Sequence, residues 1–193
     1  MVKHGKSGRI GRQHWIVAAL LVGIAVVALF AMGRPPICTC GTVKLWAGAV
    51  QSADNSQHLA DWYSPSHLIH GLLFYALGWL FLRRNPIGER LVMAVAIEAS
   101  WEVLENSAYI INRYRDATIA LGYTGDSIIN SVADIGWMIL GFLLARKLSV
   151  TAAVLLAIGL ELLALWAVRD NLTLNVLMLV WPVDAVRHWQ AGG

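Results

Sequence analysis

Three carboxylates stand at helical spacing inside one of the apolar stretches of the chain. Glu98, Glu102 and Glu105 are four and three residues apart, so a helix would project all three from one face, with Tyr109 on the same stripe. A charged side chain costs at least ~2.5 kcal/mol at the centre of a lipid bilayer. The stripe therefore predicts a helix that faces a polar or water-filled interior and not lipid.

Two other apolar stretches carry similar groups. His67 and His70 open one of them, and Asp126, Asn130 and Asp134 lie at helical spacing at the start of the other. If the three helices are neighbours, these side chains converge on one polar pocket. With a rise of ~1.5 Å per residue counted from the expected helix ends, Glu105, Asp134 and His70 lie within roughly 10 Å of the periplasmic surface of the membrane. We therefore expect the pocket to open outward.

Such a pocket suits two kinds of chemistry. Histidine and carboxylate side chains ligate divalent cations, and a carboxylate beside a histidine can serve as an acid–base pair. We expect Glu102, Glu105 and Asp134 to bind a cation or exchange protons, as the candidate catalytic groups, with His67 and His70 as metal ligands. Carboxylates this close together need protons or a compensating cation.

The candidate substrate-binding residues lie at the outer end of the same helices. Arg113 and Arg115 follow the third apolar stretch, and their guanidinium forks suit a phosphate such as a lipid head group. Asp126 and Asn130 complete the set of substrate-binding candidates. Glu161, alone in the fifth apolar stretch, either joins the pocket or faces a partner.

The composition indicates that membrane helices hold these groups. Of the 193 residues, 58% are hydrophobic and 14% charged, unlike the balance of soluble domains. We expect one all-α domain over residues 1–193, a polytopic membrane helical bundle with about five transmembrane helices and a short C-terminal half-helix. The expected spans are 15–32, 66–82, 91–111, 128–145 and 150–168, and the half-helix, either re-entrant or interfacial, is 172–183.

Basic residues near the ends of the spans predict the orientation, because lysine and arginine accumulate on the cytoplasmic side of membrane proteins. They precede the first span and follow the second and fourth: Lys3, Lys6, Arg9, Arg12, Arg83, Arg84, Arg90, Arg146 and Lys147. We expect a multi-pass protein of a bacterial inner membrane with a cytoplasmic N-terminus. The net charge of +3 then reports topology and not nucleic-acid binding.

The longest loop, residues 34–65, is expected on the periplasmic side. Its alternating polar and aromatic residues predict either a lid over the mouth of the bundle or a solvated loop. It contains Cys38 and Cys40, the only two cysteines of the chain. In an oxidising compartment they favour a disulfide that pins the loop, with a thiol metal or redox site as the alternative.

The chain contains four distinctive motifs: Cys38-Thr39-Cys40-Gly41; Asp61-Trp62-Tyr63-Ser64 followed by Ser66-His67-Leu68-Ile69-His70-Gly71; Trp101-Glu102-Val103-Leu104-Glu105-Asn106; and Gly122-Tyr123-Thr124-Gly125-Asp126-Ser127. Together they resemble an uncharacterised family of multi-pass membrane proteins from alphaproteobacteria. The resemblance covers most of the chain. It implies a cell-membrane location and no assigned activity.

A fainter resemblance covers only the middle of the chain. The order of residue types carries it: a membrane histidine, a later glutamate, an arginine and then an Asp-x-x-x-Asn step. In this chain these are His70, Glu102 or Glu105, Arg115, and Asp126 with Asn130. This order is similar to that of VanZ-like membrane proteins, which are linked to glycopeptide-antibiotic tolerance. The chain departs from it by the extra stretch Asp116 to Gly125 between the arginine and the aspartate.

Three functions remain open at this level. The leading hypothesis is an outward-facing intramembrane site that binds or transforms a lipid head group or lipid-linked phosphate, with a divalent metal as the possible cofactor; whether the protein is an enzyme stays undecided. The first alternative is a non-enzymatic assembly or scaffold protein, either a homo-oligomer or the partner of another membrane protein, whose polar rows only fix helix packing. The second is ion-coupled transport, against which the apolar residues below Glu98 argue.

Overall fold

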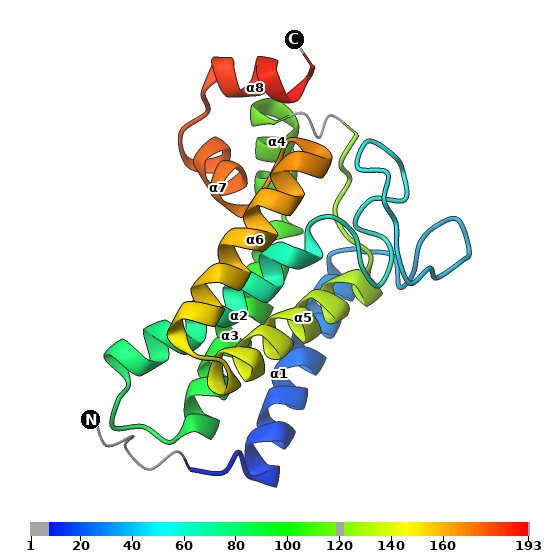
Figure 1. Ribbon diagram of the computed structural model, residues 1–193. Coiled ribbons are helices and arrows are strands. Elements are labelled where there is room, and N and C mark those ends of the chain that lie inside the picture. The colour runs from blue at the N-terminus through cyan, green and yellow to red at the C-terminus, as the bar shows by residue number, and fades with distance from the viewer. Residues whose placement is uncertain (1–7, 119–121, 193) are drawn as a thin grey trace.

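The computed structural model describes residues 8–118 and 122–192, and all of their regular secondary structure is helical apart from one isolated bridge that pairs Ala47 with Asp61 (Figure 1). The helices are α1 (Arg12–Ala31), α2 (Ser64–Phe81), α3 (Ile87–Glu105), α4 (Ala108–Ala117), α5 (Ile128–Lys147), α6 (Val150–Val168), α7 (Leu172–Val180) and α8 (Asp184–Gln190). This architecture confirms the predicted all-α bundle. Lys3 and Lys6, two of the predicted topology residues, lie outside the described part of the chain.

Three of these helices, α1, α5 and α6, are long and apolar enough to cross a membrane. The other two long helices, α2 and α3, carry the histidines and glutamates of the predicted pocket, and these polar residues lower their hydropathy. A helix with a polar face needs shelter from lipid, which packing inside a bundle provides. The count of five spans remains a prediction.

The expected span 91–111 is wrong as a single helix. The α3 helix ends at Glu105, and the side-chain amide of Asn106 folds back to donate to the Glu102 carbonyl at 3.0 Å. Ser107 then has extended backbone and begins α4 as its N-cap, with its hydroxyl accepting from the Ile110 N–H at 3.4 Å. Serine is a favoured N-cap because it satisfies an otherwise unpaired N–H of the first turn.

The C-terminal half-helix is shorter than predicted and is followed by another helix. Asn171 caps α7, accepting from the Leu174 N–H at 2.9 Å, and α7 stops at Val180, two residues before Pro182. The α8 helix, which begins at Asp184, was not among the predicted elements. The two short helices lie beside α4 at one end of the bundle, whereas the N-terminal end of α1 and the α2–α3 and α5–α6 connections lie toward the other (Figure 1).

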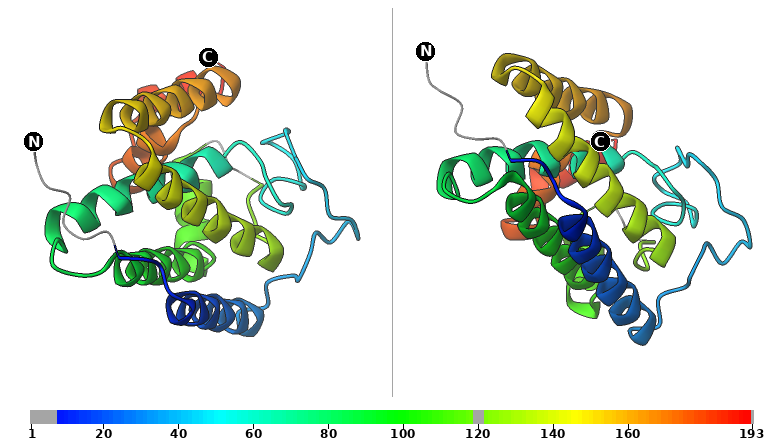
Figure 2. Two further views of the ribbon diagram at one scale, coloured as in Figure 1. Left: turned by 60° about the horizontal axis from the view of Figure 1, so that its bottom comes forward. Right: turned by 90° about the horizontal axis from the view of Figure 1, so that it is seen from below.

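The α2 and α5 helices pack with their backbones in close contact, and two glycines make this possible. A Cβ on Gly71 would collide with the Met138 carbonyl oxygen, and one on Gly141 would collide with the Leu68 carbonyl oxygen. Small residues let helix backbones approach closely in membrane proteins. The α1 helix packs along α3 on one side of this pair, and α6 lies on the opposite side of the bundle with Ala164 as its one buried residue (Figure 2).

The long loop between α1 and α2 packs onto the start of α5. The first N–H groups of α5, on Ile128 and Ile129, donate to the carbonyl oxygens of Pro35 and Pro36 at 2.9 and 3.2 Å. The Asn130 amide donates to the His58 carbonyl at 2.8 Å. The bonds from Ile128 and Ile129 give partners to backbone N–H groups at the helix N-terminus that would otherwise lack them. The loop is therefore folded against the bundle and not simply solvated, and its two cysteines form a disulfide.

Gly141→Ala is expected to destabilise the bundle, because the added methyl group would meet the α2 backbone. Overpacking of this kind costs about 1–3 kcal/mol, which lowers the apparent Tm of a chain this size by roughly 2–12 °C. Thermal denaturation of the purified protein in detergent measures the effect. The control is Gly136→Ala in the same helix, where a Cβ has nothing within 4 Å. Equal Tm values for the two variants would contradict the close approach.

Candidate functional site

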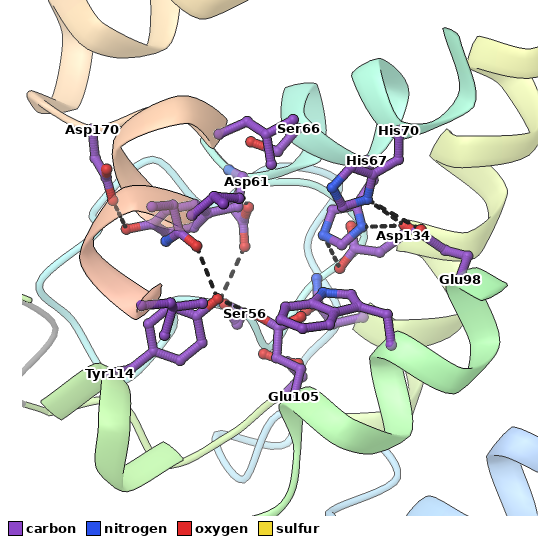
Figure 3. A pocket seen from close by; sticks show the side chains of 18 of the residues that line it. Ser56, Asp61, Ser66, His67, His70, Glu98, Glu105, Tyr114, Asp134 and Asp170 are labelled. Carbon is purple, nitrogen blue, oxygen red and sulfur yellow. Dashed lines mark hydrogen bonds and ion pairs between the residues drawn. The ribbon is translucent and has the colours of Figure 1, made fainter. Parts of the chain in front are cut away.

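A cavity of about 280 Å³ lies among α2, α3, α5, α7 and the long loop (Figure 3). Its wall combines carboxylates and histidines with apolar and aromatic side chains, and no lysine or arginine of the described chain lines it. The polar residues used below are Asp61, Tyr63, His67, His70, Glu98, Glu105, Tyr114, Tyr123, Asp126, Asn130, Asp134, Asp170 and Asn175. The lining is therefore acidic, and a bare anion would be repelled from it.

Glu98 orients both histidines of α2. Its side chain is 0% exposed, and its Oε1 lies 2.7 Å from His67 Nδ1 and 3.0 Å from His70 Nδ1. A carboxylate accepts and does not donate, so each imidazole donates its Nδ1–H to Glu98, and Nε2 is the nitrogen that can bind a cation when the ring is neutral. Histidines that bind metals are commonly oriented by such a carboxylate.

His67 is the centre of the cluster because it reaches acids on two other helices. Its Nε2 lies 3.8 Å from Asp134 Oδ2, and its Nδ1 lies 3.5 Å from Glu102 Oε1. Both oxygens of Glu102 and the Oδ1 of Asp134 are buried without a hydrogen-bond partner. Buried polar atoms rarely lack a hydrogen-bond partner, because the lost solvation costs about 1–3 kcal/mol for a neutral group and more for a charged one.

The other carboxylates of the cavity are bonded to neutral donors. Glu105 Oε1 accepts from the Tyr114 hydroxyl at 2.9 Å. Asp126 accepts from the Tyr123 hydroxyl and from the Asn106 amide, both at 2.8 Å. Burial raises the pKa of Asp126 to about 6, although these two donors partly stabilise its charge.

Asp170, between α6 and α7, closes the far end of the cavity. Its carboxylate accepts from the Asn171 N–H at 2.9 Å, the Gln190 amide at 3.1 Å and the Tyr63 hydroxyl at 3.3 Å. Burial nevertheless raises its pKa to about 6. Asp61, at the start of α2, accepts from the Tyr63 and Ser56 N–H groups at 2.7 and 3.1 Å, and burial raises its pKa as well.

Most of the predicted site residues come together. His67, His70, Glu105, Asp126, Asn130 and Asp134 all line the cavity, and Glu102 lies buried beside His67. The two arginines do not line it: Arg113 Nε donates to the Leu179 carbonyl at 2.8 Å, and Arg115 Nε donates to the Tyr123 carbonyl at 2.6 Å. The cavity therefore gives no support to their assignment as phosphate-binding groups.

Several residues of the site were absent from the predicted set. Glu98 was predicted as part of the polar stripe with Glu102 and Glu105 but was assigned no catalytic, substrate-binding or metal-binding role. Asp61 and Asp170 immediately flank apolar stretches, where a charged residue next to a span is a weak signal. Tyr63, Tyr114 and Tyr123 gave no signal, because an interfacial tyrosine is ordinary in a membrane protein.

Three overlapping groups in this cluster have the composition and proximity of metal sites. In each, one ligand atom per residue lies within 4.8 Å of the others. The groups are His67, His70 and Glu98; His67, Glu102 and Asp134; and Glu102, Glu105 and Asp126. Because His67 and Glu102 are shared, a cation in one group would also relieve charge repulsion in its neighbour.

The fold and the cavity define a class of protein: an all-helical bundle with three helices able to cross a membrane and a buried histidine–carboxylate cluster between its helices. Residues 29–192 match the family described as "Protein of unknown function (DUF2585)". The chain belongs to this family.

Its relatives are uncharacterised proteins of similar length from alphaproteobacteria. A UPF0314 protein of Novosphingobium aromaticivorans is 59% identical over 183 residues, which cover 92% of each chain. A UPF0314 protein of Agrobacterium fabrum is 59% identical over 90% of this chain and 88% of its own length. A UPF0314 protein of Rhizobium etli is 56% identical over 92% of each chain. The first resemblance is thereby confirmed, whereas these matches do not show the likeness to VanZ-like proteins. No solved structure matches the chain.

Asp170→Asn is expected to change how stability depends on pH. In the folded protein the pKa of Asp170 is about 6, above its ordinary value of 3.8, so the folded state holds this proton more tightly than the unfolded state. The resulting stabilisation, at most about 3 kcal/mol, is complete below pH 4 and is lost as the pH rises through 6. Asparagine does not titrate, so the Tm of the wild type relative to the variant should fall by several degrees between pH 4 and pH 7.

Thermal denaturation across this pH range measures that difference. The matched control is Asp116→Asn, which removes an exposed carboxylate. A wild-type Tm that keeps a constant offset from the Asp170→Asn variant over the whole range would show that Asp170 is ionised in the folded protein throughout.

Proposed function

We propose that the cavity is a divalent-cation site that binds, or transforms, a lipid head group or lipid-linked phosphate. The observation that carries this proposal is the set of buried oxygens on Glu102 and Asp134 that have no hydrogen-bond partner, beside Nε2 of His67. A cation is the partner that these atoms lack. Glu98 is the orienting residue that holds both histidine rings in the tautomer that leaves Nε2 available.

The spacing of the ligand atoms supports an ion between His67 and Asp134. Their 3.8 Å separation is too long for a hydrogen bond. It is shorter than the sum of two metal–ligand bonds, each about 2.0–2.2 Å for nitrogen or carboxylate oxygen on zinc. One ion can therefore touch both atoms without a change in backbone position.

The charge of the cavity supports binding of phosphate through the cation. No described lysine or arginine lines the wall, so an anionic head group needs a bound cation to offset the surrounding carboxylates. The apolar part of the wall, with Phe74, Ile97, Trp101, Val176 and Leu179, suits the acyl end of an amphiphile. Together these two surfaces match a lipid better than a free anion.

If the lipid is transformed, Glu105 is the general acid–base candidate. It lies on the cavity wall with one carboxylate oxygen bonded to Tyr114, which orients the group without neutralising it. A bound cation would polarise the phosphoryl oxygen and acidify a water ligand. Asp134 and Glu102 would hold that cation.

A second candidate function is a scaffold that only fixes helix packing. It is favoured by the Glu98 contact, since one fully buried carboxylate joins two turns of α2 to α3. Neutral amides would join the helices at lower desolvation cost, however, and neither oxygen of Glu102 accepts a hydrogen bond that would strengthen such a joint.

Purified protein is expected to carry about one divalent ion per chain, and Glu102→Gln and His67→Gln are expected to weaken its binding by at least about tenfold. Inductively coupled plasma mass spectrometry after equilibration with Zn²⁺, Mn²⁺ or Mg²⁺ gives the loading. The preparation contains no reductant, so the cysteines stay in their disulfide. Asp170→Asn, in the same cavity but outside the ligand groups, is the matched control and should load normally.

The same preparations report the ligand. Organic phosphate that co-purifies with the loaded wild type and is released by a chelator supports binding of a lipid phosphate through the cation. Folded wild-type protein that takes up no stoichiometric ion would overturn the cation site, and unchanged loading in both variants would move it elsewhere. Full cellular function of Glu102→Gln would favour the scaffold.

We further propose that the protein is a multi-pass inner-membrane protein with its N-terminus in the cytoplasm and the cavity mouth on the periplasmic side. Support comes from the basic residues near the α2–α3 and α5–α6 connections, among them Arg83, Arg84, Arg146 and Lys147.

Cysteine labelling is expected to distinguish the two sides. In a Cys38→Ser/Cys40→Ser background, Ser52→Cys in the long loop should react with a membrane-impermeant maleimide on intact spheroplasts. Asn85→Cys, in the α2–α3 connection, should react only after lysis. The reverse pattern would invert the orientation, and equal labelling of both positions would exclude a membrane between them.

A further inference from the structure

The long loop contains a second group of metal-ligating side chains, outside the cavity lining and independent of the function proposed above. Cys38, Cys40, Asp54 and His58 each place one ligand atom within 4.8 Å of the others. Two of them, Cys38 and His58, are buried, and Cys40 is exposed. The group is therefore assembled in the fold and reachable from solvent.

His58 has a ring nitrogen without a partner. Its side chain is 0% exposed, and its Nδ1 accepts from the Lys44 N–H at 3.2 Å. Its Nε2 is buried with no hydrogen-bond partner and lies 3.8 Å from Asp54 Oδ2. The bond from Lys44 leaves the proton of a neutral His58 ring on Nε2, facing the Asp54 carboxylate, and loss of that proton would make this nitrogen a ligand for a cation shared with Asp54.

Asp54 connects the histidine to the cysteines. Its Oδ2 forms an ion pair with the Lys44 ammonium, and its Oδ1 lies 4.0 Å from Cys38 Sγ. The Lys44 ammonium donates to this carboxylate and balances its charge, which is the role that a bound cation would take over. Lys44 is exposed and can turn its ammonium to water when a metal replaces it.

We propose that Cys38, Cys40, Asp54 and His58 bind one Zn²⁺ ion when the two cysteines are reduced. Two thiolates, one carboxylate and one imidazole nitrogen are ligand types that zinc takes in tetrahedral sites. Binding through His58 Nε2 moves the ring proton to Nδ1 and releases the bond from the Lys44 N–H. Nδ1–H and the Lys44 N–H are then both donors, so the Lys44 backbone must move away from the ring as the metal binds.

The disulfide and the metal site exclude one another, because the same two sulfur atoms serve both. Conversion requires a dithiol as reductant: one of its thiolates attacks the exposed Cys40 Sγ, the Cys38–Cys40 bond breaks, and Cys38 leaves as a thiolate. The second thiol of the reductant then attacks the mixed disulfide and frees Cys40, and the reductant is oxidised to its own disulfide. Zinc displaces the remaining thiol protons as it binds.

The test uses Co²⁺ as a spectroscopic substitute for zinc in the full-length protein in detergent. Thiolate ligands give Co²⁺ an intense near-ultraviolet charge-transfer band, which nitrogen and oxygen ligands do not give. The chain has two cysteines, so such a band can come only from this loop and not from the cavity. We expect one equivalent of Co²⁺ to produce the band after reduction with a phosphine, and one equivalent of Zn²⁺ to abolish it.

Variants then test the two other ligands. Asp54→Asn and His58→Gln should each weaken binding by at least about tenfold, whereas Asp184→Asn and His188→Gln, which change exposed residues of the same types, should not. Circular dichroism checks that each variant is folded. Absence of the band in reduced wild-type protein would overturn the proposal, and so would wild-type affinity in both loop variants.

Discussion

The burial of carboxylates around one histidine is the constraint on which the rest of the structure depends. Glu98 and Glu102 are 0% exposed and Asp134 is 5% exposed, and they come from two helices that His67 on a third helix joins. Charges at this depth are tolerated only beside a counter-charge. The glycine contact lies on the same faces: Gly71 is one turn from His67, and Gly141 is two turns from Asp134. Close packing of α2 on α5 therefore brings the ionic groups together.

The carboxylates of the cavity fall into two kinds. Asp61, Asp126 and Asp170 accept hydrogen bonds from backbone, amide and phenol donors of the long loop, the segment before α5, the start of α7 and α8. Glu102 and Asp134 keep buried oxygens with no such donor. The first kind resembles ordinary structural use of buried acids. The second is what a cation-binding site requires, because donors already in place would compete with the ion.

The short helices shape the cavity as much as the long ones do. The break at Asn106 ends α3 and starts α4, whose Tyr114 reaches back to Glu105 and across to Asn175 of α7. The same turn sends Arg113 toward the Leu179 carbonyl. The aromatic and apolar end of the cavity thus depends on an interruption that a continuous span through residue 111 would not have. With that span, the cavity would lack its α4 wall.

The sequence by itself determined the helical class, the approximate positions of the long helices and the polar faces of α2, α3 and α5. These follow from local composition and from the 3.6-residue period, which any helix imposes on its own side chains. Only the tertiary structure decided which acids are paired and which are left unpaired. It also turned Arg113 and Arg115 away from the cavity, brought Asp61 and Asp170 into it, and placed Asp54 and His58 beside the cysteines. Such contacts join residues far apart in the chain, and their geometry depends on how helices and loop pack against one another, which no local pattern encodes.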